Sequence, residues 1–302
     1  MNAGRIAAVV VRWKGGEEVE RCLRSLETED PAKPDEIVLV DAGSADGGAE
    51  HLAKIFPSIR VEALGENPGF AGAANLGVRR TSAEIILLLN PDTEILPGAL
   101  DLLTTHLREH PRLAGVVPLL ENTDGSSQFR WQLKELPTPR DLGRGHSGKP
   151  TFNRRPTGPT AVSQPAAAAW LIRRQVWDAL QGFEPAFFPA WWEDVDFCAR
   201  LQWLVTDPTS PWNEAWQVIP SAGVRHEGGS SVSSLGHRAF LDAFFGNLLK
   251  YAHRHHHREL PAIRKRLRHT LITRGILRPS RFRDYLRASK KLGTVLNAND
   301  NL

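Results

Sequence analysis

Ile85-Ile86-Leu87-Leu88-Leu89-Asn90-Pro91-Asp92-Thr93-Glu94 is a stretch in which an apolar run ends abruptly in a polar turn. Unbroken aliphatic runs of this length are typical of central strands that are covered on both faces of a parallel sheet. The run is too short to cross a bilayer. Ligands of open α/β sheets bind beyond the carboxyl ends of such strands, so we expect Asp92 at a binding edge.

Strand-like and helix-like segments alternate on both sides of this run. Apolar segments predict strands at 6–11, 36–40, 59–63 and 85–89, and helical spacing predicts helices at 17–26, 49–56, 71–80 and 97–110. Such alternation implies right-handed βαβ units. We therefore expect an α/β fold whose sheet is mostly parallel and flanked by helices.

The pattern loosens after a further apolar segment at 115–120. Residues 121–165 are rich in Pro, Gly, Ser, Arg and Asn without a sustained period, which predicts a long functional or mobile loop. Regular structure is expected again at 166–173, in a helix near 175–180, and in a helix over 194–204 whose first turn is acidic.

The C-terminal part differs from the rest in charge. Residues 235–302 contain 15 Lys and Arg against 4 Asp and Glu, a net charge of +11, whereas residues 1–234 carry −7. Apolar residues form helical stripes from Leu241 to Ala252 and from Leu260 to Leu271. We expect an α/β domain at 1–234 and a basic helical extension at 235–302.

Composition is typical of a globular protein. Cys22 and Cys198 give neither a disulfide framework nor metal-ligand spacing, which favours a reducing compartment. The N-terminus lacks a signal-peptide pattern, and no apolar run reaches the length of a membrane helix. We expect a soluble, cytoplasmic protein that does not bind nucleic acid.

Two carboxylates end predicted strands. Asp41 precedes a Gly-rich turn and suits a nucleobase or a ribose, although it can also simply stabilise that turn. Asp92, supported by Asn90, is a candidate ligand of Mg²⁺ or Mn²⁺, because these ions favour oxygen donors and share carboxylates with phosphates. The alternative for Asp92 is an ordinary turn.

A second acidic cluster, Glu193-Asp194-Val195-Asp196, follows Trp191-Trp192. Carboxylates beside bulky rings have raised pKa values, which suits a general base; the alternative is a solvated helix start. His226 is either a metal or phosphate ligand or a structural histidine. The run His255-His256-His257 looks metal-binding, but consecutive side chains diverge on a helix, so we expect no site there.

The segment Glu66–Gly77 is a turn that feeds a helix rich in small residues. Small residues let the backbone approach a ligand, and a helix N-terminus suits phosphate, which makes Gly69, Phe70 and Asn75 candidate binding residues. The alternative is close packing of helix on sheet. The dinucleotide fingerprint is absent, since Arg12-Trp13-Lys14-Gly15-Gly16 follows the first strand.

Taken in order, these segments resemble the family 2 glycosyltransferases of the GT-A fold, particularly the rhamnosyltransferase-like branch. Val40–Gly47 is similar to the family pattern V-D-x-G-S-x-D-G, and Asn67–Gly77 is similar to N-x-G-F-A-x-x-x-N-x-G. Leu89–Thr93 is similar to L-N-P-D-T, and Val224–Ser231 is similar to V-x-H-x-G-G-x-S. Gly182–Phe188 together with Glu193–Asp196 is similar to G-F-D-E-x-F-F…E-D-V-D. The ordered set is highly specific even though each motif alone is not.

The resemblance implies an inverting transfer from a nucleotide-sugar donor, a dTDP- or UDP-sugar, with Mg²⁺ or Mn²⁺. It assigns the donor to Asp41, Gly69, Phe70, Asn75, Asn90 and Asp92, the metal to Asp92 and His226, the catalytic base to Asp194, and the acceptor to Trp191, Trp192 and Glu193. The acceptor implied is a glycan or a lipid-linked sugar of cell-surface polysaccharide synthesis. The basic tail would contact the inner face of the membrane, dock on its own domain, or form a homodimer.

The chain departs from the family pattern in three places. Arg12-Trp13-Lys14 stands where the first strand usually ends in T-Y-N, Ala42 replaces a usual Asn, and the 205–216 segment looks enlarged. These departures affect donor-base contacts and the shape of the acceptor site more than the type of reaction.

Three other functions compete with a glycosyltransferase. A sugar-phosphate nucleotidylyltransferase would carry a Gly-rich, Arg-containing loop after the first strand. A retaining glycosidase needs two carboxylates about 5 Å apart, and leaves the nucleotide-like half unexplained. A non-catalytic sugar-nucleotide binding module is disfavoured because Asp41, Asp92, Asp194 and His226 are all present.

Overall fold

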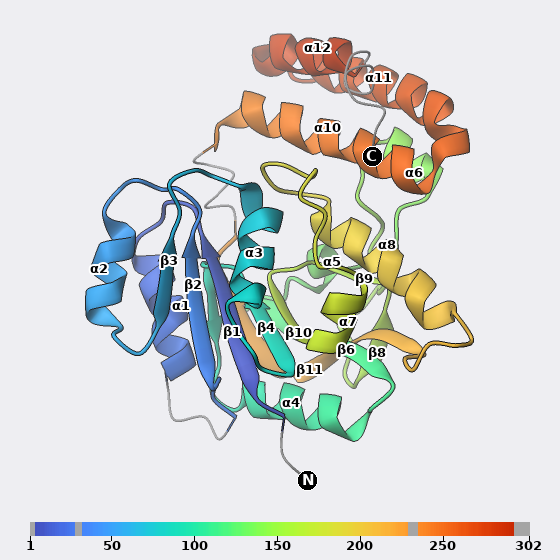
Figure 1. Ribbon diagram of the computed structural model, residues 1–302. Coiled ribbons are helices and arrows are strands. Elements are labelled where there is room, and N and C mark those ends of the chain that lie inside the picture. The colour runs from blue at the N-terminus through green and yellow to red at the C-terminus, as the bar shows by residue number, and fades with distance from the viewer. Residues whose placement is uncertain (1–3, 28–31, 229–234, 293–302) are drawn as a thin grey trace.

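The computed structural model describes residues 4–27, 32–228 and 235–292 (Figure 1). The strands of its main sheet are β1 (Ile6–Arg12), β2 (Glu36–Asp41), β3 (Arg60–Ala63), β4 (Ile85–Leu89), β5 (Thr93–Ile95), β6 (Leu113–Glu121), β8 (Thr160–Val162), β10 (Ala169–Arg173) and β11 (Glu214–His226). They lie in the order β3-β2-β1-β4-β10-β6-β11-β5, and β8 pairs with β11. The first four strands in this order are parallel neighbours, as expected.

Alternate residues of the central strands pack on opposite faces of the sheet. Ile86 and Leu88 belong to a cluster with the helices α3 (Gly69–Arg79), α7 (Arg174–Ala179) and α8 (Glu193–Thr206). Ile85, Leu87 and Leu89 belong to a cluster with α1 (Glu17–Glu27), α2 (Gly48–Ile55) and α4 (Ala99–Glu109). The apolar run at 85–89 is therefore buried on both faces, and a mostly parallel sheet flanked by helices is confirmed.

Strand β10 differs in direction from its neighbours. It runs antiparallel to both β4 and β6, and β5 runs antiparallel to β11. An apolar run predicts a strand but not its direction, because burial on both faces is the same for either direction. The strand also begins at Ala169, three residues later than the sequence suggests.

Residues 121–165 are more regular than their composition suggests. They form α5 (Phe129–Gln132), β7 (Leu133–Lys134), α6 (Pro139–Gly143) and β9 (Gln164–Pro165), in addition to β8. Strand β7 pairs with β9. Thr138 and Asp141 form a capping box at the start of α6, which explains why so short a helix is stable there. The expectation of one long irregular loop is therefore wrong.

Three helices, α10 (His237–His255), α11 (Leu260–Ile276) and α12 (Phe282–Lys291), form a layer at one end of the molecule (Figure 1). Single turns at His257–Glu259 and Pro279–Arg281 join them. The Leu241–Ala252 stripe packs against Phe187 and Trp192 of the α/β part. Within the described ranges, no helix combines the length and the apolar character needed to cross a membrane.

Candidate active site

The carboxyl ends of the parallel strands meet at one edge of the sheet. Arg12 at the end of β1 lies opposite Asp41 at the end of β2, and the β1–β4 register brings Asn90 to the same edge. The Asn90 N–H donates to the carbonyl of Ala168, just before β10, at 2.9 Å. The turn that carries Asp92 therefore begins at the edge where α/β sheets bind ligands.

Asp41 is held by an internal ion pair. One of its carboxylate oxygens accepts from the buried guanidinium of Arg12, and the other accepts from the Ser44 N–H at 2.7 Å. Arg12 also donates to both oxygens of Asp46, at 2.8 and 2.7 Å. The Arg12 guanidinium lowers the pKa of Asp46. Asp41 and Asp46 therefore share one buried guanidinium, and contact of Asp41 with the nucleobase of a sugar donor stays a prediction.

The glycine turn before α3 packs against the segment that precedes the acidic cluster. The Phe70 N–H donates to the carbonyl of Pro189 at 2.8 Å. A Cβ on Gly69 would lie 2.9 Å from that carbonyl oxygen, so only glycine fits here, and its φ of +76° is in the left-handed region. The Asn75 amide donates to Phe183 O and accepts from Phe183 N–H, at 2.7 and 2.9 Å. That Gly69, Phe70 and Asn75 contact the nucleotide-sugar donor stays a prediction.

Asp92 and His226 are both buried and face each other. Nε2 of His226 lies 3.5 Å from Oδ1 of Asp92. Nδ1 of His226 donates to the amide oxygen of Gln128 at 2.8 Å, and the amide nitrogen of Gln128 donates to the His226 carbonyl at 2.8 Å. The indole of Trp131 stacks on the imidazole, with the ring centroids 5.4 Å apart. The structure therefore brings together two of the predicted residues and adds Gln128 and Trp131.

This pair suits a divalent cation. Burial lowers the pKa of His226, although the charges of Asp92 and Glu227 oppose the shift. With the proton on Nδ1, the lone pair of Nε2 of a neutral His226 faces a carboxylate oxygen of Asp92. An imidazole nitrogen and a carboxylate oxygen are both common metal ligands. No group of three or more potential ligands occurs among the residues described, so phosphate or water would complete the shell. A cavity of about 10 Å³ lies beside Asp92.

The acidic cluster occupies the first turn of α8. Asp194 accepts from the Val195 N–H at 2.8 Å and from the Ala167 N–H at 3.4 Å. Burial raises the pKa of Asp194, and burial followed by the charge of Asp194 raises the pKa of Glu193. Ala167 adjoins Ala168, which bonds Asn90, so Asp194 lies near the Asn90–Asp92 turn. The raised pKa values agree with the expectation for carboxylates beside bulky rings.

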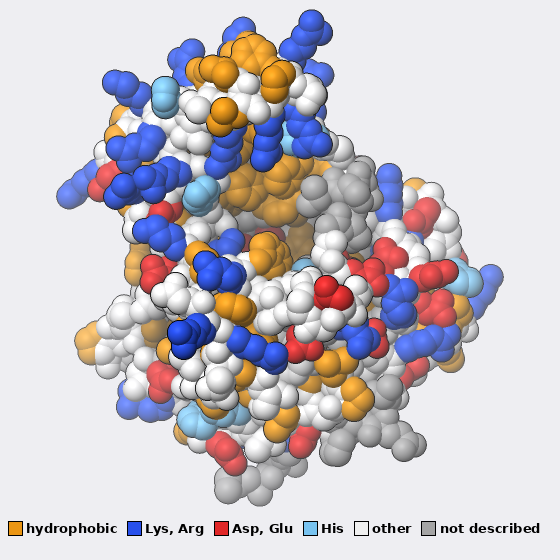
Figure 2. Space-filling view, turned by 180° about the vertical axis from the view of Figure 1, so that it is seen from behind, with side chains coloured by type: hydrophobic (Ala, Val, Ile, Leu, Met, Phe, Trp, Pro, Cys, Tyr) orange, Lys and Arg blue, Asp and Glu red, His pale blue; other side chains and the backbone are white. Residues whose placement is uncertain are grey.

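The tryptophans before the cluster face the helical extension. Trp192 is buried against Phe244 and Tyr251 of α10, with ring centroids 5.5 and 5.3 Å away, and Trp191 meets Phe240 edge-on at 4.9 Å. Seen from behind, the surface is hollowed between the extension and the α/β part, and hydrophobic side chains line its upper wall (Figure 2). Whether Trp191, Trp192 and Glu193 contact an acceptor stays a prediction.

The extension also holds the backbone around these tryptophans. The Asn247 amide lies within hydrogen-bonding distance of the carbonyls of Phe188, Ala190 and Trp191, at 3.0 to 3.2 Å. Lys250 reaches the carbonyl of Ala186. The strand-end residues were found from the sequence, but these helix residues were not, because polar residues beside an apolar stripe carry no motif.

His255 has a partner in the acidic cluster. Its Nε2 lies 2.7 Å from Oδ1 of Asp196, whose other oxygen accepts from Arg200 at 2.8 Å. The hydrogen bond from His255 and the charges of Arg200 and Arg254 lower the pKa of Asp196 against its burial. The third carboxylate of the cluster is therefore tied into the extension, and only Glu193 and Asp194 have raised pKa values.

Comparisons with known proteins give the family of this chain and its relatives. A family model described as Glycosyl transferase family 2 matches residues 8–180. N-acetylglucosaminyl-diphospho-decaprenol L-rhamnosyltransferases from two strains of Mycobacterium tuberculosis are 27% identical over 250 residues, which cover 73% of this chain and 75% of theirs. The motif at 224–231 ends outside the described residues, which stop at Gly228 in this part of the chain.

Solved structures share the fold. GalNAc-T7 with UDP, GalNAc and Mn²⁺ gives a TM-score of 0.57 at 13% identity, over 80% of this chain and only 48% of GalNAc-T7. The Pyrobaculum calidifontis mannosyltransferase PcManGT with GDP-Man and Mn²⁺ gives 0.54 at 15% identity, over 99% of this chain and 76% of the mannosyltransferase. S. aureus TarS with UDP gives 0.53 at 14% identity, over 88% and 70%. The expected GT-A fold is confirmed.

Proposed function

Because the chain belongs to glycosyl transferase family 2, we propose that it transfers a sugar, with inversion, from a nucleoside diphosphate to a hydroxyl of a lipid-linked glycan acceptor. The observation that carries the proposal is a carboxylate of raised pKa, Asp194, held through Ala167 and Ala168 beside the turn that bears Asp92. A base and a phosphate-binding edge are the two elements that such a transfer needs.

The donor diphosphate is assigned to the Asp92 edge. Asp92 and Nε2 of His226 would hold Mg²⁺ or Mn²⁺, and Gln128 fixes the tautomer that leaves Nε2 able to bind it. When bound, the cation neutralises charge that develops on the leaving diphosphate. The Mn²⁺ in the GalNAc-T7 and PcManGT structures supports the same chemistry here. Asp41 and the glycine turn at Gly69 would contact the nucleoside of a dTDP- or UDP-sugar.

The acceptor hydroxyl is assigned to Asp194. Its carboxylate accepts the hydroxyl proton as the oxygen attacks the anomeric carbon from the side opposite the diphosphate, and one such displacement inverts the configuration. A raised pKa makes Asp194 a stronger base, provided that it is ionised at the working pH. The Oε2 atom of Glu193 and Nε1 of Trp192 are buried without a partner among the described residues, so both have unused hydrogen-bonding capacity next to Asp194.

The class of acceptor comes from the relatives and from the extension. The Mycobacterium tuberculosis relatives are named for a decaprenyl-diphosphate-linked acceptor. At the end of α11, Ile276 and Leu277 are 63% and 75% exposed, and Phe282 is exposed beside them. Hydrophobic side chains surrounded by Lys and Arg are visible at the top of the molecule in Figure 2. Apolar residues among cations favour a peripheral membrane contact at the face where lipid-linked sugars reside.

Transfer of rhamnose from dTDP-rhamnose to an N-acetylglucosaminyl-diphospho-prenol, with Mn²⁺ and with EDTA, tests the proposal. Product is expected with the cation only, and its anomeric configuration should be opposite to that of the donor. UDP-sugars are assayed beside dTDP-rhamnose because the sequence leaves both donors open. Hydrolysis of several donors without any transfer to lipid-linked acceptors would overturn the acceptor assignment, and a retained configuration would overturn the single displacement.

A further inference from the structure

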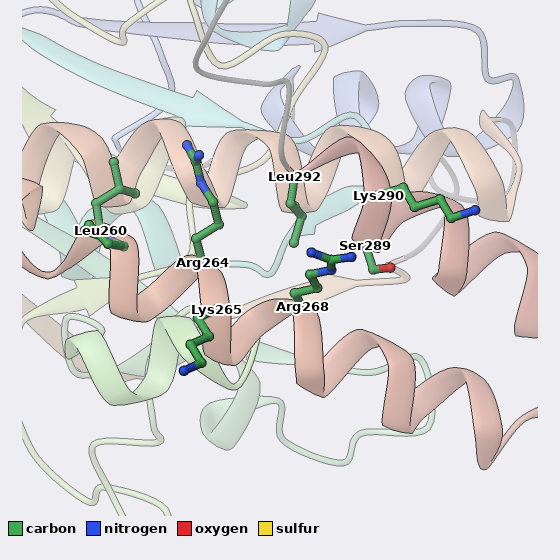
Figure 3. Close-up of a pocket in the computed structure, with 8 residues that line it drawn as sticks. Leu260, Arg264, Lys265, Arg268, Ser289, Lys290 and Leu292 are labelled. Atoms are coloured by element: carbon green, nitrogen blue, oxygen red, sulfur yellow. The ribbon is translucent and has the colours of Figure 1, made fainter.

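A groove of about 510 Å³ lies between α11 and α12, away from the strand ends described above (Figure 3). It is lined by Leu260, Pro261, Arg264, Lys265, Arg268, Ser289, Lys290 and Leu292. Four of these residues are cationic and none is acidic. The groove is therefore a positively charged pocket with aliphatic side chains in its wall.

The cations of this groove lack acidic partners in the described part of the chain. Among the described residues, no ion pair or hydrogen bond is made by the side chains of Arg264, Lys265, Arg268 or Lys290, and Nε of Arg264 is buried without an acceptor. The adjacent cations behave differently, because Arg287 and Lys291 both reach Asp242, at 3.4 and 2.6 Å. A buried donor without an acceptor costs free energy, so the groove is suited to an anion.

The side chains that line the groove indicate which class of anion it binds. Guanidinium groups bind phosphate with a planar fork of donors, and Arg264 and Arg268 are one helical turn apart, on the same face of α11. Leu260, Pro261 and Leu292 add apolar surface beside them. A free anion would leave that apolar surface exposed to water, whereas the acyl or prenyl chain attached to a lipid phosphate would cover it.

We propose that the groove between α11 and α12 binds the phosphate of an anionic membrane lipid, with the first part of the lipid chain against Leu260, Pro261 and Leu292. The proposal deepens the proposed membrane location by naming a site. The exposed Ile276 and Leu277 lie about 18 Å away along α11, given a rise of about 1.5 Å per residue over the twelve residues from Arg264. Two separate contacts would fix the orientation of the extension on a membrane.

Binding to vesicles tests the site without any sugar transfer, so its failure is distinct from failure of the proposed activity. The full chain is titrated with phosphatidylcholine vesicles that contain or lack phosphatidylglycerol, at constant ionic strength. The variant Arg264→Gln/Arg268→Gln is compared with Arg258→Gln/Arg283→Gln, which removes the same charge from exposed positions outside the groove. Arg268→Glu, at an exposed position, covers the case in which the double variant does not fold.

The groove variant should bind anionic vesicles about 25-fold more weakly, since each of the two basic residues near such a surface contributes about fivefold. The control variant Arg258→Gln/Arg283→Gln should lose clearly less affinity for anionic vesicles. Equal losses would mean diffuse attraction by the whole basic surface and would overturn the site. A second arm titrates short-chain phosphatidic acid against inorganic phosphate: tighter binding of the lipid, weakened in Arg268→Glu, supports the proposal, and equal binding of inorganic phosphate overturns the lipid assignment.

Discussion

The two halves of the candidate site are built from different kinds of structure. Asp92 stands on a turn between a strand that is buried on both faces and the short strand β5, and its partner His226 ends β11, which pairs with β5. Asp194 begins a helix, and the segment before it is held by Asn247 of the extension. The first half is formed by the sheet itself, whereas the second half depends on helices that follow it in the chain.

Burial shifts the pKa values of the two halves in opposite directions. It lowers the pKa of His226 and raises the pKa of Asp194, because a buried environment disfavours the charged form of either group. A neutral imidazole is suited to binding a cation, and a carboxylate of raised pKa is suited to accepting a proton. One physical cause therefore prepares two different chemistries at one edge of the sheet.

Asp194→Asn is expected to have the largest effect, and it tests the assignment of the base to the helical half. Transfer should fall about 10²–10⁴-fold, because the amide cannot accept the hydroxyl proton. Calorimetric titration should show donor binding close to that of the wild type. Asp178→Asn, at an exposed position on α7, is the control and should leave transfer unchanged. Near wild-type turnover of Asp194→Asn on a verified acceptor would show that the base is another group.

Asp92→Ala tests the strand-end half. With Mn²⁺, binding of the nucleoside diphosphate should weaken by about tenfold or more, because a charged ligand is lost. In EDTA the variant and the wild type should bind alike. Asp101→Ala on α4, an exposed carboxylate, controls for the change in net charge. Equal losses in both conditions would remove Asp92 from the metal site.

The two halves also differ in how far the sequence predicted them. The run at 85–89 and the turn after it predicted β4 and the edge position of Asp92, because local pattern and burial agree there. The direction of β10 was not predictable from that pattern. Gln128, the residue before α5, was missed because it stands in a segment whose composition is that of a loop. Asn247 was missed because its three carbonyl partners are more than fifty residues away.

Asn247→Ala tests how far the helical half depends on the extension. Removal of the amide leaves buried carbonyls with fewer donors, which should lower the free energy of unfolding by about 1–3 kcal/mol. Transfer should fall more than donor binding, because the released segment leads into Asp194. Arg238→Ala, an exposed residue on the same helix, should change neither the denaturation midpoint nor turnover. If both variants unfold like the wild type, the carbonyl contacts do not stabilise the segment.

Lys134→Met should give the smallest effect, a displaced pH profile. Burial raises the pKa of Asp194, and the positive charge of Lys134 is among the influences that lower it. Burial lowers the pKa of Lys134 itself, and the charge of Asp194 opposes that shift. Without that charge the pKa of Asp194 rises, so the acidic limb of kcat/KM should move to higher pH by about half a unit to one unit. Activity is lost first at low pH, and the plateau above the limb stays the same.

Lys134→Arg retains the charge and should leave the limb in place. A limb that does not move in Lys134→Met would mean that Asp194 is not the group that titrates.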